Sequence, residues 1–129
     1  MARRDKQRAA AGVLGKELTR RSSGRCELCA SRDRPIVWEI PPFGAEPDCD
    51  RALLACTACR EQLEGGPMEP IGCRHLSTAV WDERVPVRLA AARLLLRLDG
   101  PDHPQTQDVF ESVGFDPVSG ELVEVAWDS

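Results

Sequence analysis

Two Cys-x-x-Cys pairs, Cys26–Cys29 and Cys56–Cys59, are the residues of this chain best suited to chemistry. Two intervening residues let both sulfur atoms of a pair reach one metal ion, and four thiolates complete a tetrahedral shell that suits Zn²⁺. Such a shell has no open position for water, so the ion would be structural rather than catalytic. The sequence therefore predicts one structural zinc ion, bound by Cys26, Cys29, Cys56 and Cys59.

Disulfide bonds or a redox-active Cys-x-x-Cys pair are the alternatives to zinc. The N-terminal residues are rich in arginine and contain no apolar stretch of the kind found in secretion signals, and no apolar run approaches the ~18 residues of a membrane span. We therefore expect a cytoplasmic protein with reduced thiols and no membrane contact. A redox pair would stand alone beside a βαβ pattern, which the sequence lacks.

Four further side chains could bind a metal ion, but their spacing matches no recognised site. Cys49, between two aspartates, is interpreted as a free loop cysteine, and His75 as a residue at a helix cap or at the edge of the core. A second metal site that combines Cys73 and His75 with Cys49 or His103 is chemically allowed, although no spacing predicts it.

Charge is unevenly distributed along the chain. Residues 1–25 carry eight lysines and arginines against two acidic residues, whereas residues 26–129 carry nine against nineteen. A basic arm on an acidic body predicts at most weak, salt-dependent contact with a nucleic-acid backbone and no broad phosphate-binding face. A solvated helix or an intramolecular partner for the acidic part fits the arm equally well, and the sequence identifies no protein partner. The arm's cations nearest the N-terminus are Arg3, Arg4, Lys6 and Arg8.

The elements that must position the cysteines are a helix, a hairpin and a second helix. Residues 4–22 predict a basic helix with an apolar stripe that ends near Gly24. Residues 35–40 predict a strand that ends at two prolines, residues 43–51 a loop and residues 53–55 the returning strand. Residues 56–63 predict a helix with Thr57 as its cap. The stripe of the first helix consists of Val13, Leu14 and Leu18.

This order of elements is typical of a treble-clef zinc finger. Free N–H groups and the positive end of the second helix dipole would lower the free-energy cost of thiolates at Cys56 and Cys59. The alternative is a zinc ribbon, with both pairs on hairpins. The twenty-six residues between the pairs exceed the ~15–20 usual for a ribbon, which favours the treble clef.

The remaining residues predict a mainly helical part. A short helix over 76–81 is expected to bury Trp81, and a helix over 86–98 to pack Leu94 and Leu98 onto the zinc module. A weaker helix over 105–113 precedes a hairpin with its turn at 116–120 and a strand around Val123, Val125 and Trp127. The predicted fold is a small α+β unit formed by the N-terminal helix (1–25), the zinc module (26–66) and the helical part (67–129), with the zinc module and the helical part folding together.

Around the cysteines the chain resembles the longer PhnA-type proteins, small zinc proteins named for a bacterial alkylphosphonate-utilisation operon. This resemblance implies bound zinc and an association with phosphonate genes, without implying an activity. It is carried by SGRCELC (23–29), VWEIPP (37–42), LACTACREQL (54–63), RHL (74–76) with Trp81, and Val85-Pro86.

The same frame is similar to that of zinc-bearing HNH nucleases. That resemblance implies a histidine just before the proline of the strand, acting as general base beside Mg²⁺. Here Glu39 occupies that region, and a carboxylate is a poor base at neutral pH unless it is buried. Arg60 and Gln62 stand where the nuclease helix has histidine or asparagine. We therefore predict no catalytic residues and expect a zinc-stabilised binding module, with a hydrolase that uses Glu39, or a nucleic-acid-binding zinc finger, as the alternatives.

Overall fold

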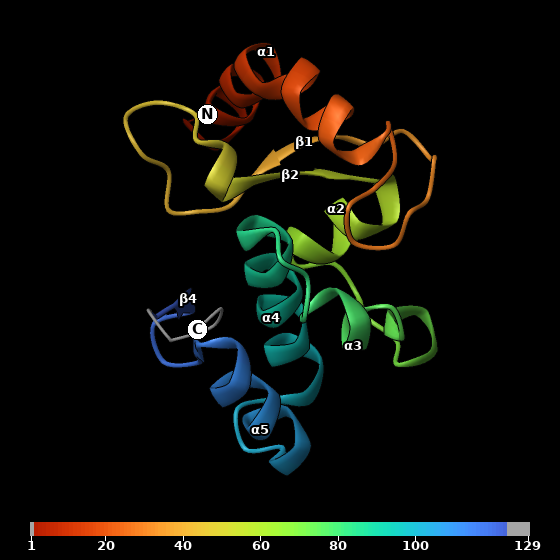
Figure 1. The fold of residues 1–129 in the computed structure, drawn as a ribbon, viewed down its shortest axis with the longest axis vertical. Coiled ribbons are helices and arrows are strands. Elements are labelled where there is room, and N and C mark those ends of the chain that lie inside the picture. The colour runs from red at the N-terminus through yellow and green to blue at the C-terminus, as the bar shows by residue number, and fades with distance from the viewer. Residues whose placement is uncertain (1, 124–129) are drawn as a thin grey trace.

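The computed structural model describes residues 2–123, with side-chain burial described at residues 12–70 and 72–123. This part of the chain is a small α+β fold with five helices and two small antiparallel sheets (Figure 1). Short 3₁₀ turns at Cys49–Arg51 and Ile71–Cys73 precede β2 and α3. The elements are α1 (Ala2–Ser22), β1 (Ile36–Glu39), β2 (Ala52–Ala55), α2 (Thr57–Leu63), α3 (Leu76–Ala79), α4 (Val85–Asp99), α5 (Pro104–Val113), β3 (Phe115–Asp116) and β4 (Glu121–Leu122).

The hairpin of β1 and β2 lies between two layers of apolar packing. Its strands are antiparallel, with Val37 opposite Leu54. Because successive side chains of a strand point to opposite faces, these two pack with Leu14 and Leu18 of α1, while Trp38 enters the main core. In Figure 1, α1 lies across this hairpin on the side away from α4. Both faces of the hairpin are thus covered, which explains why β2 is wholly apolar.

Helix α4 runs through the middle of the molecule (Figure 1). Pro86 lies in its first turn, where a backbone N–H has no partner within the helix, and its end is marked by Gly100, whose N–H donates to the Leu96 carbonyl. Eight of its fifteen residues are buried, Leu94 to 1% exposure, and it contacts α2, α3, α5 and β2. The prediction of a helix over 86–98 is confirmed, and this helix packs directly on the elements that carry the second cysteine pair.

Trp81 was predicted to be buried, and this is wrong: it is 46% exposed. The short helix α3 ends at Ala79 rather than continuing to residue 81, so the chain has already turned before the tryptophan. Val80, with no exposed surface, takes the core position instead. Among the described residues, the tryptophan of the core is Trp38, which is 4% exposed and whose Nε1–H donates to Glu64 Oε1 at 3.2 Å.

Two smaller predictions about helix faces and caps are also wrong. Val13 is 65% exposed, because it lies off the face of α1 that meets the hairpin, which Leu14 and Leu18 share at a spacing of four residues. Thr57 is the first residue of α2 rather than its cap, and Cys56 occupies the capping position.

The C-terminal hairpin is fastened to the loop after β1. Glu121 accepts hydrogen bonds from Arg51 at 2.6 Å and from Arg93 at 2.6 Å, and both arginines also donate to the Pro41 carbonyl. The predicted turn over 116–120 is present between β3 and β4. Of the strand residues predicted beyond it, Val123 is half exposed, whereas Val125 and Trp127 lie outside the described residues.

Candidate metal centre

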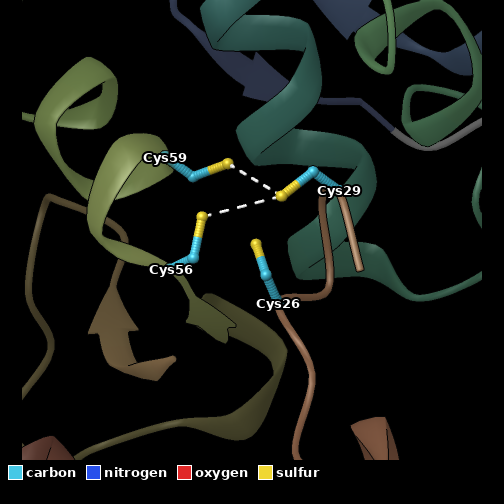
Figure 2. A group of neighbouring side chains, drawn as sticks. All are labelled: Cys26, Cys29, Cys56 and Cys59. Carbon is cyan, nitrogen blue, oxygen red and sulfur yellow. Dashed lines mark hydrogen bonds between the residues drawn. The ribbon is translucent and has the colours of Figure 1, made fainter. Parts of the chain in front are cut away.

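Cys26 and Cys29 lie in a tight loop between α1 and β1. The Cys26 N–H donates to the Ser31 carbonyl at 2.9 Å, and the Ala30 N–H donates to the Cys26 carbonyl at 2.8 Å. Ala30 adopts a left-handed backbone, with φ of 67°, to close this loop. The two sulfur atoms consequently point to the same side of the loop (Figure 2).

Two backbone hydrogen bonds fasten this loop to the segment that carries the second cysteine pair. The Glu27 N–H donates to the Leu54 carbonyl at 2.8 Å, and the Thr57 N–H donates to the Asp33 carbonyl at 3.1 Å. The first bond fixes the loop to β2 and the second to the start of α2. The sequence places the two pairs twenty-six residues apart, and these contacts bring them together.

The four sulfur atoms of Cys26, Cys29, Cys56 and Cys59 converge on one point (Figure 2) and all lie within 4.8 Å of one another. The Sγ atom of Cys29 lies 3.6 Å from that of Cys56 and 3.8 Å from that of Cys59. Four sulfurs ~2.3 Å from one zinc ion in a tetrahedron are separated by ~3.8 Å. The donor set therefore fits a metal ion such as zinc, and none of these cysteines forms a disulfide.

The electrostatics of the four thiols show why a cation would be favoured between them. Hydrogen bonds from Cys59 and from the backbone N–H groups of Cys56, Cys29 and Leu28 lower the pKa of Cys26 to about 4, against the opposing effect of burial. Burial, together with the charge on Cys26, raises the pKa of Cys29 to about 12. The hydrogen bond to Cys26, with burial, also raises the pKa of Cys59. One thiolate thus opposes ionisation of its neighbours, and a divalent cation would remove that repulsion.

Glu27, between the first two cysteines, organises the surroundings of the site. Its side chain has no exposed surface and bonds Arg21 of α1 at 2.8 Å and Arg84, just before α4, at 3.0 Å. Its Oε1 also accepts the backbone N–H of Leu54 at 2.9 Å. Arg84 in turn makes two hydrogen bonds with the carboxylate of Asp82. This role of Glu27 could not be predicted from the sequence, because its local signal is no more than an acidic residue between two cysteines.

His75 lies beside the cluster, with its Nε2 atom 4.0 Å from the Sγ of Cys59. Burial lowers the pKa of His75, partly opposed by the charge on Cys26. The histidine occupies the capping position of α3 without making a side-chain cap. Its place at the core edge agrees with the sequence interpretation, but its proximity to the cysteines was not predicted.

The second metal site considered from the sequence is not assembled. Cys73 is buried in the core, and His103 caps α5 by accepting the Thr106 N–H at Nδ1. Cys49, which is partly exposed, lies in the 3₁₀ turn before β2, where it forms a group of three possible ligands with two exposed neighbouring aspartates. Within residues 2–123, that group and the four cysteines are the clusters that could hold a metal.

A cavity of about 390 Å³ opens beside the first cysteine pair. Cys26 and Cys29 form one wall, and His75 and Thr78 of the α3 segment form another. Glu39, the residue considered as a general base, does not line this cavity. It is 3% exposed and pairs with Ala52, which packs on the α1 side of the hairpin.

In comparisons with known proteins, no family model matches the chain, and neither a curated protein nor a solved structure gives a significant match. Among the described residues, no helix combines the length and apolarity that a membrane crossing requires.

Proposed function

We propose that this protein is a zinc-stabilised binding module in which Cys26, Cys29, Cys56 and Cys59 hold one structural zinc ion. The convergence of four sulfur atoms from two distant segments, at separations that suit zinc, is the observation that carries this proposal. A four-thiolate shell leaves no position for water or substrate on the ion, so the metal would supply cohesion rather than catalysis.

The treble-clef architecture is part of this proposal. A cysteine loop, a two-stranded hairpin and a helix that begins at the second cysteine pair follow one another in the order such a module requires. Zinc would join the loop before the hairpin to the helix after it. In the absence of matching structures, this order of elements and the position of the four sulfurs are its support.

Metal content tests the proposal directly. We expect one zinc per chain by native mass spectrometry of the full protein purified under reducing conditions, and loss of that zinc in Cys56→Ser. Cys49→Ser is the matched control, because Cys49 lies outside the four-sulfur cluster and should leave the zinc content unchanged. Folded wild-type protein with clearly substoichiometric zinc would contradict the proposal.

We further propose that the module acts on a protein or nucleic-acid partner, with Arg3, Arg4, Lys6 and Arg8 of the basic arm providing weak contact with nucleic acid. The charge asymmetry of the chain supports this role. Titration with duplex DNA should give a dissociation constant in the non-specific range of ~10⁻⁴–10⁻⁶ M that weakens as salt rises. Replacing these four residues by glutamine should weaken DNA binding and reduce its dependence on salt. If the wild-type protein does not bind DNA at low salt, the proposed nucleic-acid contact is wrong.

The link to phosphonate utilisation rests on the sequence resemblance to PhnA-type proteins and is likewise a proposal. The competing hydrolase hypothesis needs Glu39 as a base, and this residue lies on the α1 side of the hairpin rather than in the wall of the cavity beside the cysteines. Incubating metal-replete protein with supercoiled plasmid and Mg²⁺, or with a simple phosphonate, distinguishes a binding module from a hydrolase. Turnover that disappears in Glu39→Gln would favour the enzyme.

A further inference from the structure

The four cysteines of the centre differ in how far they are shielded from solvent. Cys26, Cys56 and Cys59 are 2–3% exposed, whereas Cys29 is partly exposed. Cys56 and Cys59 are absent from the walls of the 390 Å³ cavity, which Cys29 lines together with His75. An external molecule that reaches the centre through this cavity therefore meets the first cysteine pair.

The two cysteines of that pair also differ in how far they can be reached. Cys26 is 3% exposed, whereas Cys29 is partly exposed and extends toward the second pair, with its Sγ atom 3.6 Å from that of Cys56 and 3.8 Å from that of Cys59. Cys29 is thus the more accessible sulfur of the pair.

The charges around the cavity indicate what kind of molecule it would admit. Arg84 is neutralised by its ion pairs with Glu27 and Asp82. Arg25 adds a positive charge at the cavity wall, but four thiolates around Zn²⁺ carry a net negative charge. An anion gains little in this setting, so the cavity suits a small molecule that carries no negative charge.

We propose that Cys29 is the reactive thiolate of this centre and is alkylated by small, uncharged electrophiles that enter the cavity. In this step the Cys29 sulfur forms a bond to the electrophilic carbon, the bond from that carbon to its leaving group breaks, and the leaving group departs as an anion with the electron pair. No proton has to be removed, because metal binding already requires the thiolate. The inference rests on the proposed zinc centre and adds a modification site to it.

The test uses zinc-replete full-length protein treated with iodoacetamide at about pH 6, roughly two units below the ordinary thiol pKa. Zinc content and adduct position are followed together by native mass spectrometry and peptide mapping. We expect the first carbamidomethyl group on Cys29, formed before Cys26, Cys56 or Cys59 carries any and while zinc is still bound. Cys49 is an internal reference for a thiol that remains protonated at this pH, since burial and nearby acidic charges raise its pKa.

The outcomes separate the inference from the zinc proposal. Cys29 should also react at a rate that changes little between about pH 6 and 8, while the rate at Cys49 rises about tenfold per pH unit. Zinc-loaded protein in which the four cysteines are modified together, or only after zinc release, would overturn the inference and leave the zinc centre intact. Protein without zinc would overturn both. Cys49→Ser should leave modification of Cys29 unchanged, which confirms that Cys29 reacts independently of the loop cysteine.

Discussion

Glu27 illustrates how a residue that binds no metal can decide whether a metal site forms. Its buried carboxylate holds Arg21 and Arg84 and the Leu54 N–H, and so connects the first cysteine loop with α1, β2 and the segment before α4. Removing one partner from a buried ionic network leaves the remaining charges without compensation, which typically costs about 3–5 kcal/mol. The acid between the cysteines is thus an organising residue of the site.

We predict that Glu27→Ala lowers the free energy of unfolding by about 3–5 kcal/mol. Urea denaturation of the zinc-loaded protein measures this. Glu111→Ala, at an exposed position of α5, is the control and should change stability by less than about 0.5 kcal/mol. Equal effects of the two substitutions would show that the network around Glu27 contributes nothing.

The ion pair between Asp82 and Arg84 should make stability depend on pH. A hydrogen bond from Arg84 lowers the pKa of this carboxyl, so its contribution to stability is complete above the unfolded pKa of ~3.9 and is lost as pH falls through the folded value. Asp82→Asn should destabilise the protein at pH 7 by about 0.5–1 kcal/mol, since the pair is partly exposed. The difference from wild type should shrink as the pH is lowered below about 4. A difference that is the same at both pH values would contradict this.

The sequence identifies the four cysteines but not their neighbours, for a physical reason. Two residues between cysteines is a local constraint that any loop of that length obeys, so the spacing of each pair already predicts a shared ion. The approach of His75 to Cys59 and the burial of Glu27 depend on where α3 and α4 pack, and no local pattern encodes that packing. The chemistry of the site could therefore be predicted, and its surroundings could not.

At the scale of elements, α4 was the easiest to predict and α3 the hardest. Pro86 and Gly100 mark the ends of a fifteen-residue helix, and its apolar residues recur with helical periodicity. The four-residue α3 is too short for periodicity to reveal a face, so the largest side chain, Trp81, was placed in the core by size alone. The prediction that Trp81 is buried was wrong because α3 ends at Ala79, before residue 81.

We predict that Leu94→Ala lowers the free energy of unfolding by about 2–5 kcal/mol, because it leaves a cavity in the core beneath α4. Leu94 is 1% exposed, whereas Val118, at 94%, provides a matched control for the loss of an apolar side chain. Val118→Ala should leave the melting temperature almost unchanged. An unaffected melting temperature in Leu94→Ala would place α4 outside the cooperative core.

Two glycines, one in the middle of α1 and one just after its end, lead to opposite predictions. A Cβ added at Gly12 meets nothing within 4 Å, and alanine is the better helix former, so Gly12→Ala should stabilise the protein by up to about 1 kcal/mol. Gly24 has a φ of 74°, a backbone that strains any residue with a Cβ, so Gly24→Ala should destabilise by about 1 kcal/mol. Thermal melts of the two variants check both signs, and changes of equal sign would contradict the pair of predictions.

At the scale of the whole molecule, one apolar core contains both the metal ligands and the C-terminal helices. Cys26, Cys56 and Cys59 share this core with Leu94 and Phe110, so the zinc module and the helical part have no separate interiors. The apolar layer between α1 and the hairpin is the second, smaller cluster. Loss of the metal should consequently destabilise parts of the core well beyond the four cysteines.

We predict that a zinc chelator unfolds the described part of the protein in one step. Structural zinc contributes apparent free energies of ~10–16 kcal/mol in small fingers, which is comparable with the ~5–15 kcal/mol stability of a whole domain. Helical circular dichroism and tryptophan fluorescence should then change together during chelator titration. Helical signal that persists after tryptophan fluorescence has changed would show that α4 and α5 hold together without the metal.

The loop that carries Cys26 and Cys29 precedes the hairpin in the sequence and the helix that begins at Cys56 follows it, so the proposed ion would tie together two segments that are twenty-six residues apart along the chain. On that basis the amount of folded protein in a cell follows mass action, and each tenfold fall in free zinc removes about 1.4 kcal/mol of apparent stability as long as free zinc stays well above its dissociation constant. Unfolded chains are the ones that proteases degrade. The steady-state abundance of this protein would thereby report the zinc supply of its cell.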